Sequence, residues 1–319
     1  MANLNLSAGV PVAAEISLPR RRQAPWRKHL TSYAFVVPYV LAMLLFGLGP
    51  GLYALLISFA DFGAGVPRYF AAGFHNYLTA FKDFRFGFTL TNIVSFLGIS
   101  VPLGIAVVVM LAMLLHMRPG RLSSALRTIY FIGGAVTGPV LVLVFIIMLN
   151  PLLSPFGPFL HALDLNSFDD VVTPHTLALL FTLIGFFSGA GMWIAIQYGA
   201  LEGIPVELLD AAKIDGCDAW KQLFYIKLPL IRPYIIYQFI LIFAGNVQIF
   251  VEPQLMGNQT YVQGNVPHIW SPNQLAYSFA FEMGNFGAAA ALSLLMLLIG
   301  LAASYLVIRW TGFFNIEAR

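Results

Sequence analysis

The chain has 319 residues, of which 59% are hydrophobic and 10% are charged. Soluble domains carry about 25% charged residues, so the composition excludes a soluble globular protein and indicates a membrane protein. The net charge of +3 is no sign of nucleic-acid binding, because its placement has a simpler cause, and the single cysteine, Cys217, excludes an intrachain disulfide.

The chain begins with a polar stretch, residues 1–29, that contains five basic residues. A basic start resembles a signal peptide. The apolar run that follows, however, is about twice as long as the 7–15 residues of a signal sequence. We therefore expect an N-terminal tail over 1–29 and an uncleaved first membrane helix after it.

Six apolar runs approach or exceed the ~20 residues that a helix needs to cross a bilayer. In chain order they are residues 34–60, 88–116, 125–149, 175–201, 232–254 and 287–309. A membrane barrel would instead show alternating segments of about 10 residues. The sequence predicts an all-α integral membrane protein with six transmembrane helices.

The basic residues between these runs predict the orientation. Alternate loops lie on the same side of the membrane, and the lysines and arginines divide into 14 on one side and 3 on the other. Basic residues accumulate on the cytoplasmic side. We expect a multi-pass protein of the plasma (inner) membrane with both termini in the cytoplasm, which also explains the basic balance.

Glycine and proline interrupt several of the predicted helices. Close packing of helices through small residues explains them, and so do hinges or a wet cavity in a moving bundle. The residues by themselves leave both explanations open. The positions are Pro38, Gly49, Pro50, Gly51, Pro102, Gly133, Gly134, Gly138, Pro139, Gly189, Gly191 and Gly245.

Catalytic and ATP-binding motifs are absent from the sequence. It contains no GxxxxGK[ST] phosphate loop and no HExxH metal motif. No helix centre carries an ionisable residue, which counts against a proton-coupled carrier, although a sodium-coupled carrier could use backbone carbonyls. We expect a non-catalytic chain that binds no metal and no cofactor.

The segment 202–232 gathers nine of the 31 Asp, Glu, Lys and Arg residues. Pro205 and Glu207 suit a helix start, and Gly216 stands where a left-handed helix end is expected. A second helix follows, with Asp218 near its start and Pro229 at its end. The physics leaves two interpretations open: an amphipathic connector on the membrane surface, or a socket for another protein.

The stretch "DAAKIDGCDAWKQLFYIKLP" resembles the EAA loop of ABC importer permeases. Residues that match the family pattern are Asp210, Ala211, Ala212, Asp215, Gly216, Ile226, Leu228 and Pro229. Three positions depart from it: Asp210 replaces Glu, Cys217 replaces Ala and Leu223 replaces Phe. Further stretches at 59–62, 73–81, 149–151, 199–205 and 277–293 are similar to carbohydrate-type permeases, and the last, taken to open the final helix, resembles the first-permease type of maltose and glycerol-phosphate importers.

The resemblance implies a type I importer permease fold over 30–319, with the EAA loop at 202–232. It implies a transmembrane half-pathway for a sugar or related polyol and a second homologous permease, expected as a heterodimer partner. It further implies two cytoplasmic ATPase subunits, which would hold ATP and Mg, and an extracytoplasmic solute-binding protein. Asp210, Ala211, Ala212, Asp215, Gly216, Leu228 and Pro229 would then couple to the ATPase, and Pro139, Gly191 and Gly245 become candidates for hinge or cavity roles.

In this family the solute site lies within the bundle near mid-membrane, and the candidates are Trp193, Asn246, Gln248, Phe250 and Glu252. Sugars need polar groups for their hydroxyls and aromatic faces for their C–H patches. On one continuous helix, Gln248 and Glu252 share a face, whereas Asn246 and Phe250 share another. We therefore expect that these residues cannot all face one cavity, and that Gln254, after Pro253, lies outside the helix. Helix–helix hydrogen bonding and interface anchoring are the alternative roles.

Overall fold

A computed structural model describes residues 25–62, 66–136, 138–258 and 266–311, with side chains from residue 33 onward. It divides into two units, residues 1–51 and 52–319, which are described separately. The described residues form helices and loops, with one isolated antiparallel bridge between Asp61 and Arg68. The predicted all-α class is confirmed.

The first unit contains α1 (Pro25–Ala42), the π-helix η1 (Met43–Leu48) and the start of α2 (Gly49–Ser58). Pro50 has no N–H, and the π-helix just before it takes up the change in hydrogen bonding, with Gly49 N–H donating to the Leu44 carbonyl. The helix Tyr33–Ser58 is long and apolar enough to cross a membrane. Because α1 begins at Pro25, helical structure already starts within the predicted tail, whose first 24 residues lie outside the described part of the chain.

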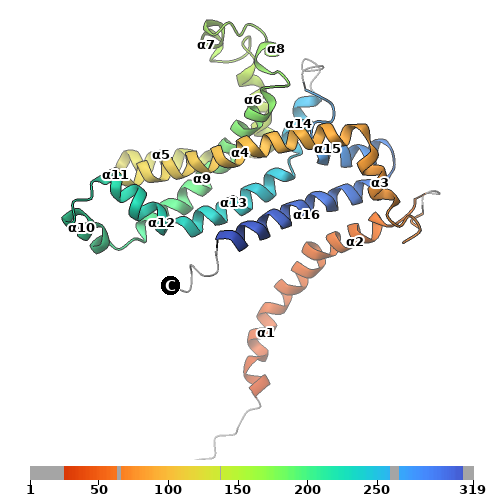
Figure 1. The fold of residues 1–319 in the computed structure, drawn as a ribbon, viewed down its shortest axis with the longest axis horizontal. Helices are drawn as coiled ribbons and strands as arrows, with labels where there is room; N and C mark the ends of the chain where they lie inside the picture. Colours follow the sequence, from red (N-terminus) through yellow and green to blue (C-terminus); the bar gives the residue numbers. More distant parts are fainter. Residues whose placement is uncertain (1–24, 63–65, 137, 259–265, 312–319) are drawn as a thin grey trace, which may run out of the picture. The chain divides into compact units, whose positions relative to one another are not determined.

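Four long helices, together with shorter ones, make up the second unit (Figure 1). After the end of α2, its elements before the segment 206–230 are α3 (His75–Lys82), α4 (Phe84–Met117), α5 (Arg121–Gly133), α6 (Gly138–Leu149), α7 (Gly157–Ala162), α8 (Phe168–Val171) and α9 (Leu177–Glu202). After it come α13 (Arg232–Val247), α14 (Val251–Gly257), α15 (Pro272–Tyr277), the π-helix η4 (Ser278–Glu282) and α16 (Phe286–Thr311).

The long helices α4, α9, α13 and α16 run side by side; α4 packs against both α9 and α13, and α13 packs against α16 (Figure 1). Their inward residues form apolar clusters, one of which contains Val108, Trp193 and Ile194. Many outward residues are large and apolar as well. Helices that are apolar all round are typical of membrane spans, and α4, α9, α16 and Arg232–Gly257 each meet the length and hydropathy of a crossing helix.

The third predicted helix, 125–149, is not straight. It is divided into α5 and α6, which are bent by 104° at a short break, so the described residues contain five clear spans and a sixth only if this pair counts as one. Gly133 and Gly134 precede the break, and Gly138 and Pro139 follow it. A proline and clustered glycines at one place explain the bend, although the prediction treated the run as one helix.

Glycines also let α5 and α9 approach closely. A Cβ on Gly191 would stand 2.2 Å from the backbone oxygen of Tyr130, and one on Gly134 would stand 2.9 Å from that of Ser188. Real side chains cannot occupy such positions, so these two glycines serve close packing. Gly189 and Gly245 have open space at the same position.

The final helix begins later than the motif at 277–293 suggested. Residues 278–282 form the π-helix η4, Gly284 adopts a positive φ of 67°, and α16 starts at Phe286. The motif therefore spans a π-helix, a turn and a helix start rather than one helix.

Near the start of α16, the buried Asn76 donates to the carbonyls of Ser58 and Ala60, both at 2.9 Å, and packs against Gly287.

Candidate functional site

The segment 206–230 folds as two short helices about a glycine, at one end of the bundle (Figure 1). These are α10 (Val206–Ile214) and α11 (Ala219–Gln222), and α11 continues through the π-helix η2 (Leu223–Lys227) into α12 (Leu228–Leu230). We call this segment the helical elbow. The predicted helix–turn–helix is confirmed.

Gly216 makes the turn of the elbow. Its φ is +82°, in the left-handed region that glycine enters at no steric cost. Gly216 N–H donates to the Lys213 carbonyl at 3.0 Å and Cys217 N–H donates to the Ala212 carbonyl at 2.9 Å. This is a Schellman ending. Asp218 then begins the second helix, because its side chain accepts from Lys221 N–H at 2.7 Å.

Buried residues hold the two helices of the elbow together and fix the elbow to the bundle. Gln222 is buried, and its Nε2 donates to the carbonyls of Leu209 (3.3 Å) and Cys217 (3.4 Å), which ties the second helix to the first. Leu223 packs in a cluster with residues from α4 and α9. Lys227 Nζ lies 3.1 Å from His116 Nδ1 at the end of α4.

The Lys227 ammonium loses solvent in this position. Burial lowers the pKa of Lys227, and the positive charge of Lys213 lowers it further. A lysine within the apolar run of the second helix is a sequence signal that its ammonium is buried. Its partner on α4 lies 111 residues away, which no local pattern reveals.

The elbow exposes large apolar side chains among its charged ones. Ile214 is 87% exposed and Tyr225 is 78% exposed, and Trp220 stacks on Phe224 with the ring centroids 6.5 Å apart. Of the predicted coupling residues, Ala212 is buried and Leu228 is half-buried. The others are exposed: Asp210, Ala211, Asp215, Gly216 and Pro229. Exposed apolar groups of this size mark interaction surfaces.

Pro229 does not end the second helix, contrary to the prediction. It is the second residue of α12, and the helix runs on to Leu230. In the π-helix before it, Leu228 N–H donates to the Leu223 carbonyl, five residues earlier. This change in the hydrogen-bond pattern lets the helix continue past Pro229, which has no N–H to donate. The chain turns only at Ile231, before α13.

Two adjoining hollows lie between α4, α9 and α13. The first has a volume of about 80 Å³ and the second about 200 Å³, and both are lined by Phe96, Phe181, Gly185 and Asn246. Trp193, Ser100 and Thr182 line the first hollow. Gln248, Phe250 and Glu252 line the second, together with Gly245. The five predicted solute-path residues thus all line one or other hollow.

The expectation that residues 246–252 cannot all face one cavity is wrong, because the helix is broken there. α13 ends at Val247 and α14 begins at Val251. Pro253 has no N–H to bond to the Ile249 carbonyl in a continuous helix, and Asn273 Nδ2 satisfies the freed Gln248 carbonyl at 2.8 Å. Asn246, Gln248 and Glu252 therefore turn to the same hollow.

Two amides close to these hollows also contact neighbouring helices. Asn246 Nδ2 donates to Ser100 Oγ on α4 at 3.0 Å. Gln254 lies beyond the end of α13, as expected, but within the separate helix α14, and its Oε1 accepts from Gln274 Nε2 at 3.0 Å. Asn246 thus combines a helix–helix bond with a place in the wall of the hollows.

A buried glutamine pair joins α9 and α13 one helical turn beyond the first hollow. Gln197 and Gln238 are both 0% exposed, and Gln197 Nε2 donates to Gln238 Oε1. Gln197 lies four residues after Trp193, and Gln238 four residues before Ile242, which also lines the first hollow. The remaining atoms, Gln197 Oε1 and Gln238 Nε2, have no partner within the described residues.

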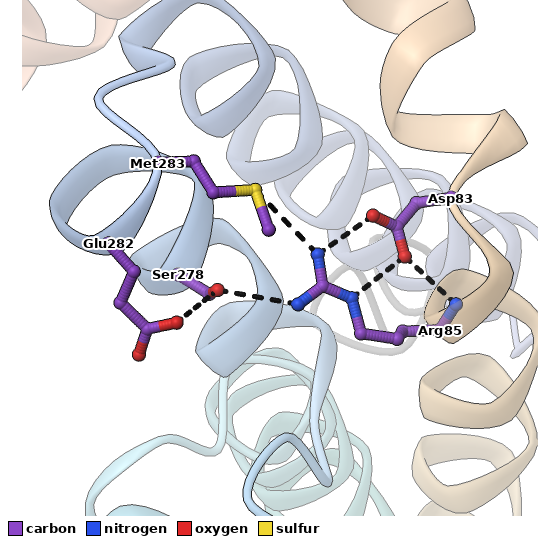
Figure 2. A network of polar contacts seen from close by, with 5 residues as sticks. All are labelled: Asp83, Arg85, Ser278, Glu282 and Met283. Carbon is purple, nitrogen blue, oxygen red and sulfur yellow. Dashed lines mark hydrogen bonds and ion pairs between the residues drawn. The ribbon is translucent and has the colours of Figure 1, made fainter.

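The opposite end of the bundle carries a polar network that sequence reasoning missed. Figure 2 shows Arg85 at its centre: its Nη2 pairs with Asp83 at 2.8 Å and approaches Met283 Sδ at 3.8 Å, and its Nη1 reaches Ser278 Oγ at 3.5 Å. Ser278 Oγ donates to Glu282 Oε2 at 2.5 Å. The Arg85 hydrogen bond lowers the pKa of Asp83. The network ties the start of α4 to η4.

The sequence matches the family described as "Binding-protein-dependent transport system inner membrane component" over residues 77–310. An arabinooligosaccharides transport system permease protein, AraP, of Bacillus subtilis is 24% identical, covering 93% of this chain and 95% of the relative. A diacetylchitobiose uptake system permease protein, NgcF, of Streptomyces coelicolor is 28% identical, covering 94% and 88%. A trehalose/maltose transport system permease protein, MalF, of Thermococcus litoralis is 24% identical, covering 87% and 92%.

Solved structures share the fold. A chain from a bacterial alginate ABC transporter in complex with an alginate pentasaccharide-bound periplasmic protein superposes with a TM-score of 0.74 at 17% identity, covering 89% of this chain and 94% of that one. A chain from a bacterial ABC transporter involved in the import of the acidic polysaccharide alginate gives 0.75 at 17% identity, covering 90% and 96%. The type I importer permease fold is confirmed.

Proposed function

Because this chain belongs to the family of inner membrane components of binding-protein-dependent transport systems, we propose that it forms half of an import path for a short saccharide. In this proposal the helical elbow receives the push of an ATPase subunit. The observation that carries it is the elbow itself, a helix–glycine–helix unit that exposes large apolar side chains, within a family of transport permeases.

A saccharide is the solute class that the hollows suit. Saccharides bind through hydroxyls, which need amide, hydroxyl and carboxylate groups, and through C–H faces, which pack on aromatic rings. The hollows offer Asn246, Gln248 and Glu252 for the first need and Trp193 and Phe250 for the second. Three relatives are named for saccharides, which supports the same class.

The depth of the hollows suits a site within the bilayer. Trp193 lies nine residues before the end of α9 at Glu202, or about 14 Å along a helix. Asn246 lies 14 residues after the start of α13, or about 21 Å. The hydrocarbon core is about 30 Å thick. The hollows therefore begin near mid-membrane and extend away from the elbow.

The orientation follows from the basic residues. With 14 lysines and arginines on one side and 3 on the other, the elbow and both termini face the cytoplasm in this proposal. The Arg85 network then faces the extracytoplasmic side, where a solute-binding protein would dock. A second, homologous permease, here proposed to be a different chain, covers part of the apolar outer surface, and two ATPase subunits supply ATP hydrolysis and its Mg.

The chain itself has no catalytic role in this scheme. Closure of the ATPase pair moves the elbow, whose two helices Gln222 holds together, and the buried packing of Leu223 transmits that movement to α4 and α9. A secondary carrier, by contrast, would import solute without an ATPase and would have no use for the elbow. Co-purification separates the two: a stable complex with an ATPase supports the proposal, and active uptake by the isolated chain contradicts it.

The solute site is tested in the reconstituted complex with its binding protein. We expect alanine at both Gln248 and Glu252 to abolish most of the ATPase stimulation that the loaded binding protein causes, because both side chains line the second hollow. Alanine at Asn285, which caps α16 at the outer end through a 2.9 Å bond to Ala288 N–H and lines neither hollow, is the control. Unchanged stimulation in the double variant would remove these residues from the solute path.

A further inference from the structure

The two hollows contain one charged group. Their walls consist of aromatic rings, small residues, hydroxyls and amides, and among the described residues Glu252 is the single charged side chain that lines either of them. No lysine, arginine or histidine of the described part of the chain lines them. A solute in the second hollow therefore meets a carboxylate without a compensating positive charge in the wall.

Within the described residues, the Glu252 carboxylate also has no ion-pair partner. The ion pairs of the described residues involve Asp61, Asp83, Asp210 and Glu282, and none involves Glu252. Glu252 is half-buried in the first turn of α14, where the helix dipole favours a negative charge. Because Glu252 lines the second hollow, its negative charge acts on any solute that occupies the hollow.

From this arrangement we propose that Glu252 makes the permease selective by charge, accepting neutral and amino saccharides and rejecting acidic ones. The inference rests on the proposed function, because it assumes that a saccharide occupies the hollow. A carboxylate accepts hydrogen bonds from hydroxyls and attracts ammonium groups, whereas a second carboxylate nearby is repelled strongly in a poorly solvated site. The proposal thus separates this chain from the structural relative that imports the acidic polysaccharide alginate.

The test uses three β-1,4-linked disaccharides of matched size: cellobiose, which is neutral, cellobiouronic acid, which is anionic, and the glucosamine dimer, which is cationic. Binding to the whole transporter complex in nanodiscs is measured at pH 7.5 without ATP. The solute-binding protein is omitted, so that its own selectivity does not enter. We expect cellobiouronic acid to bind about 30-fold more weakly than cellobiose, from a like-charge repulsion across a partly solvated hollow. The glucosamine dimer is expected to bind at least as well as cellobiose.

Glu252→Gln should bring the affinities for cellobiose and cellobiouronic acid together, because the amide keeps the shape of the side chain but carries no charge; the readout is the ratio of these two affinities, whatever the change in cellobiose affinity itself. Glu282→Gln is the matched control, since Glu282 is another half-exposed carboxylate that lines neither hollow. If Glu252→Gln does not assemble, Gln248→Glu adds a second carboxylate to the same hollow and must widen the gap between cellobiose and the uronic acid.

Three outcomes would overturn the inference. Equal binding of cellobiose and cellobiouronic acid by the wild type contradicts charge selection but leaves the saccharide function intact. Unchanged discrimination in Glu252→Gln assigns the selectivity to other groups. If none of the three disaccharides binds the intact complex, the saccharide function itself fails, and the charge selection with it.

Discussion

Substitution of Gly216 tests whether the helical elbow works as a rigid unit. The φ of +82° is open to glycine, costs a side-chain residue about 1–2 kcal/mol and is out of reach for proline. A Cβ at Gly216 would meet nothing within 4 Å, so Gly216→Ala changes only this conformational term. Gly216→Pro additionally removes the N–H that donates to the Lys213 carbonyl at 3.0 Å.

The expected loss of ATPase affinity follows from the conformational cost of placing a side chain at position 216. A penalty of about 1–2 kcal/mol lowers the equilibrium constant between the bent elbow and its other conformations about 5- to 30-fold. If the ATPase recognises the bent form, its affinity for the permease falls by up to the same factor in Gly216→Ala. Gly216→Asn should fall less, because asparagine tolerates the left-handed region, and Gly216→Pro should abolish assembly or uncouple ATP hydrolysis from uptake.

Affinity of the ATPase for the permease in nanodiscs and ATP-driven uptake in proteoliposomes measure these effects. Gly73→Ala is the matched control, because Gly73 also has a positive φ (51°) and open space around its Cβ. It should alter neither quantity. Full affinity and normal uptake with Gly216→Pro, or an equal loss with Gly73→Ala, would refute the role of the elbow as a coupling unit.

Three further predictions concern the bundle. Gln238→Leu should destabilise the protein by about 1–3 kcal/mol, because it leaves the buried amide of Gln197 without a hydrogen-bond partner, whereas replacing both glutamines by leucine should cost much less. Thermal unfolding in detergent measures the stability of the single and the double variant, and equal losses in the two would contradict the buried hydrogen bond. Gly191→Ala should lower the melting temperature, because its Cβ would stand 2.2 Å from a backbone oxygen of α5, whereas Gly189→Ala, with open space, should not. The Arg85 guanidinium lowers the pKa of Asp83, so the ion pair stabilises the protein above the ordinary pKa of an aspartate and this stabilisation fades as the pH falls below about 4. The difference in stability between wild type and Asp83→Asn should therefore shrink in that pH range. A constant difference from about pH 7 to 3 would exclude the ion pair as the source of the difference.

Local features of the chain were predictable because their causes lie within a few residues. Composition and run length predict the membrane helices, since about 20 apolar residues suffice to span the bilayer. The bend at Gly216 is predictable because a left-handed helix end needs glycine and two nearby carbonyls, all within five residues.

Proline was a less reliable signal, because its effect depends on the turn before it. Pro229 was expected to end a helix, but a π-helix lets the chain continue past it. Pro253 contributes to a full break of the fifth predicted helix, where the carbonyl of Gln248 finds a side-chain donor on Asn273. The difference lies in which groups can satisfy the freed backbone, and in the second case that group is 25 residues away.

The sequence by itself determined that this protein is a helical membrane protein, which segment forms the elbow, and which residues are candidates for the solute path. Only the tertiary structure decided that Trp193, Asn246 and Glu252 line adjoining hollows, and that a glycine such as Gly191 serves packing. The physical reason is that burial, open space and unpaired charge are properties of several helices together. The chemistry of Glu252 could be read from the chain, but its place as the single charge in the hollows could not.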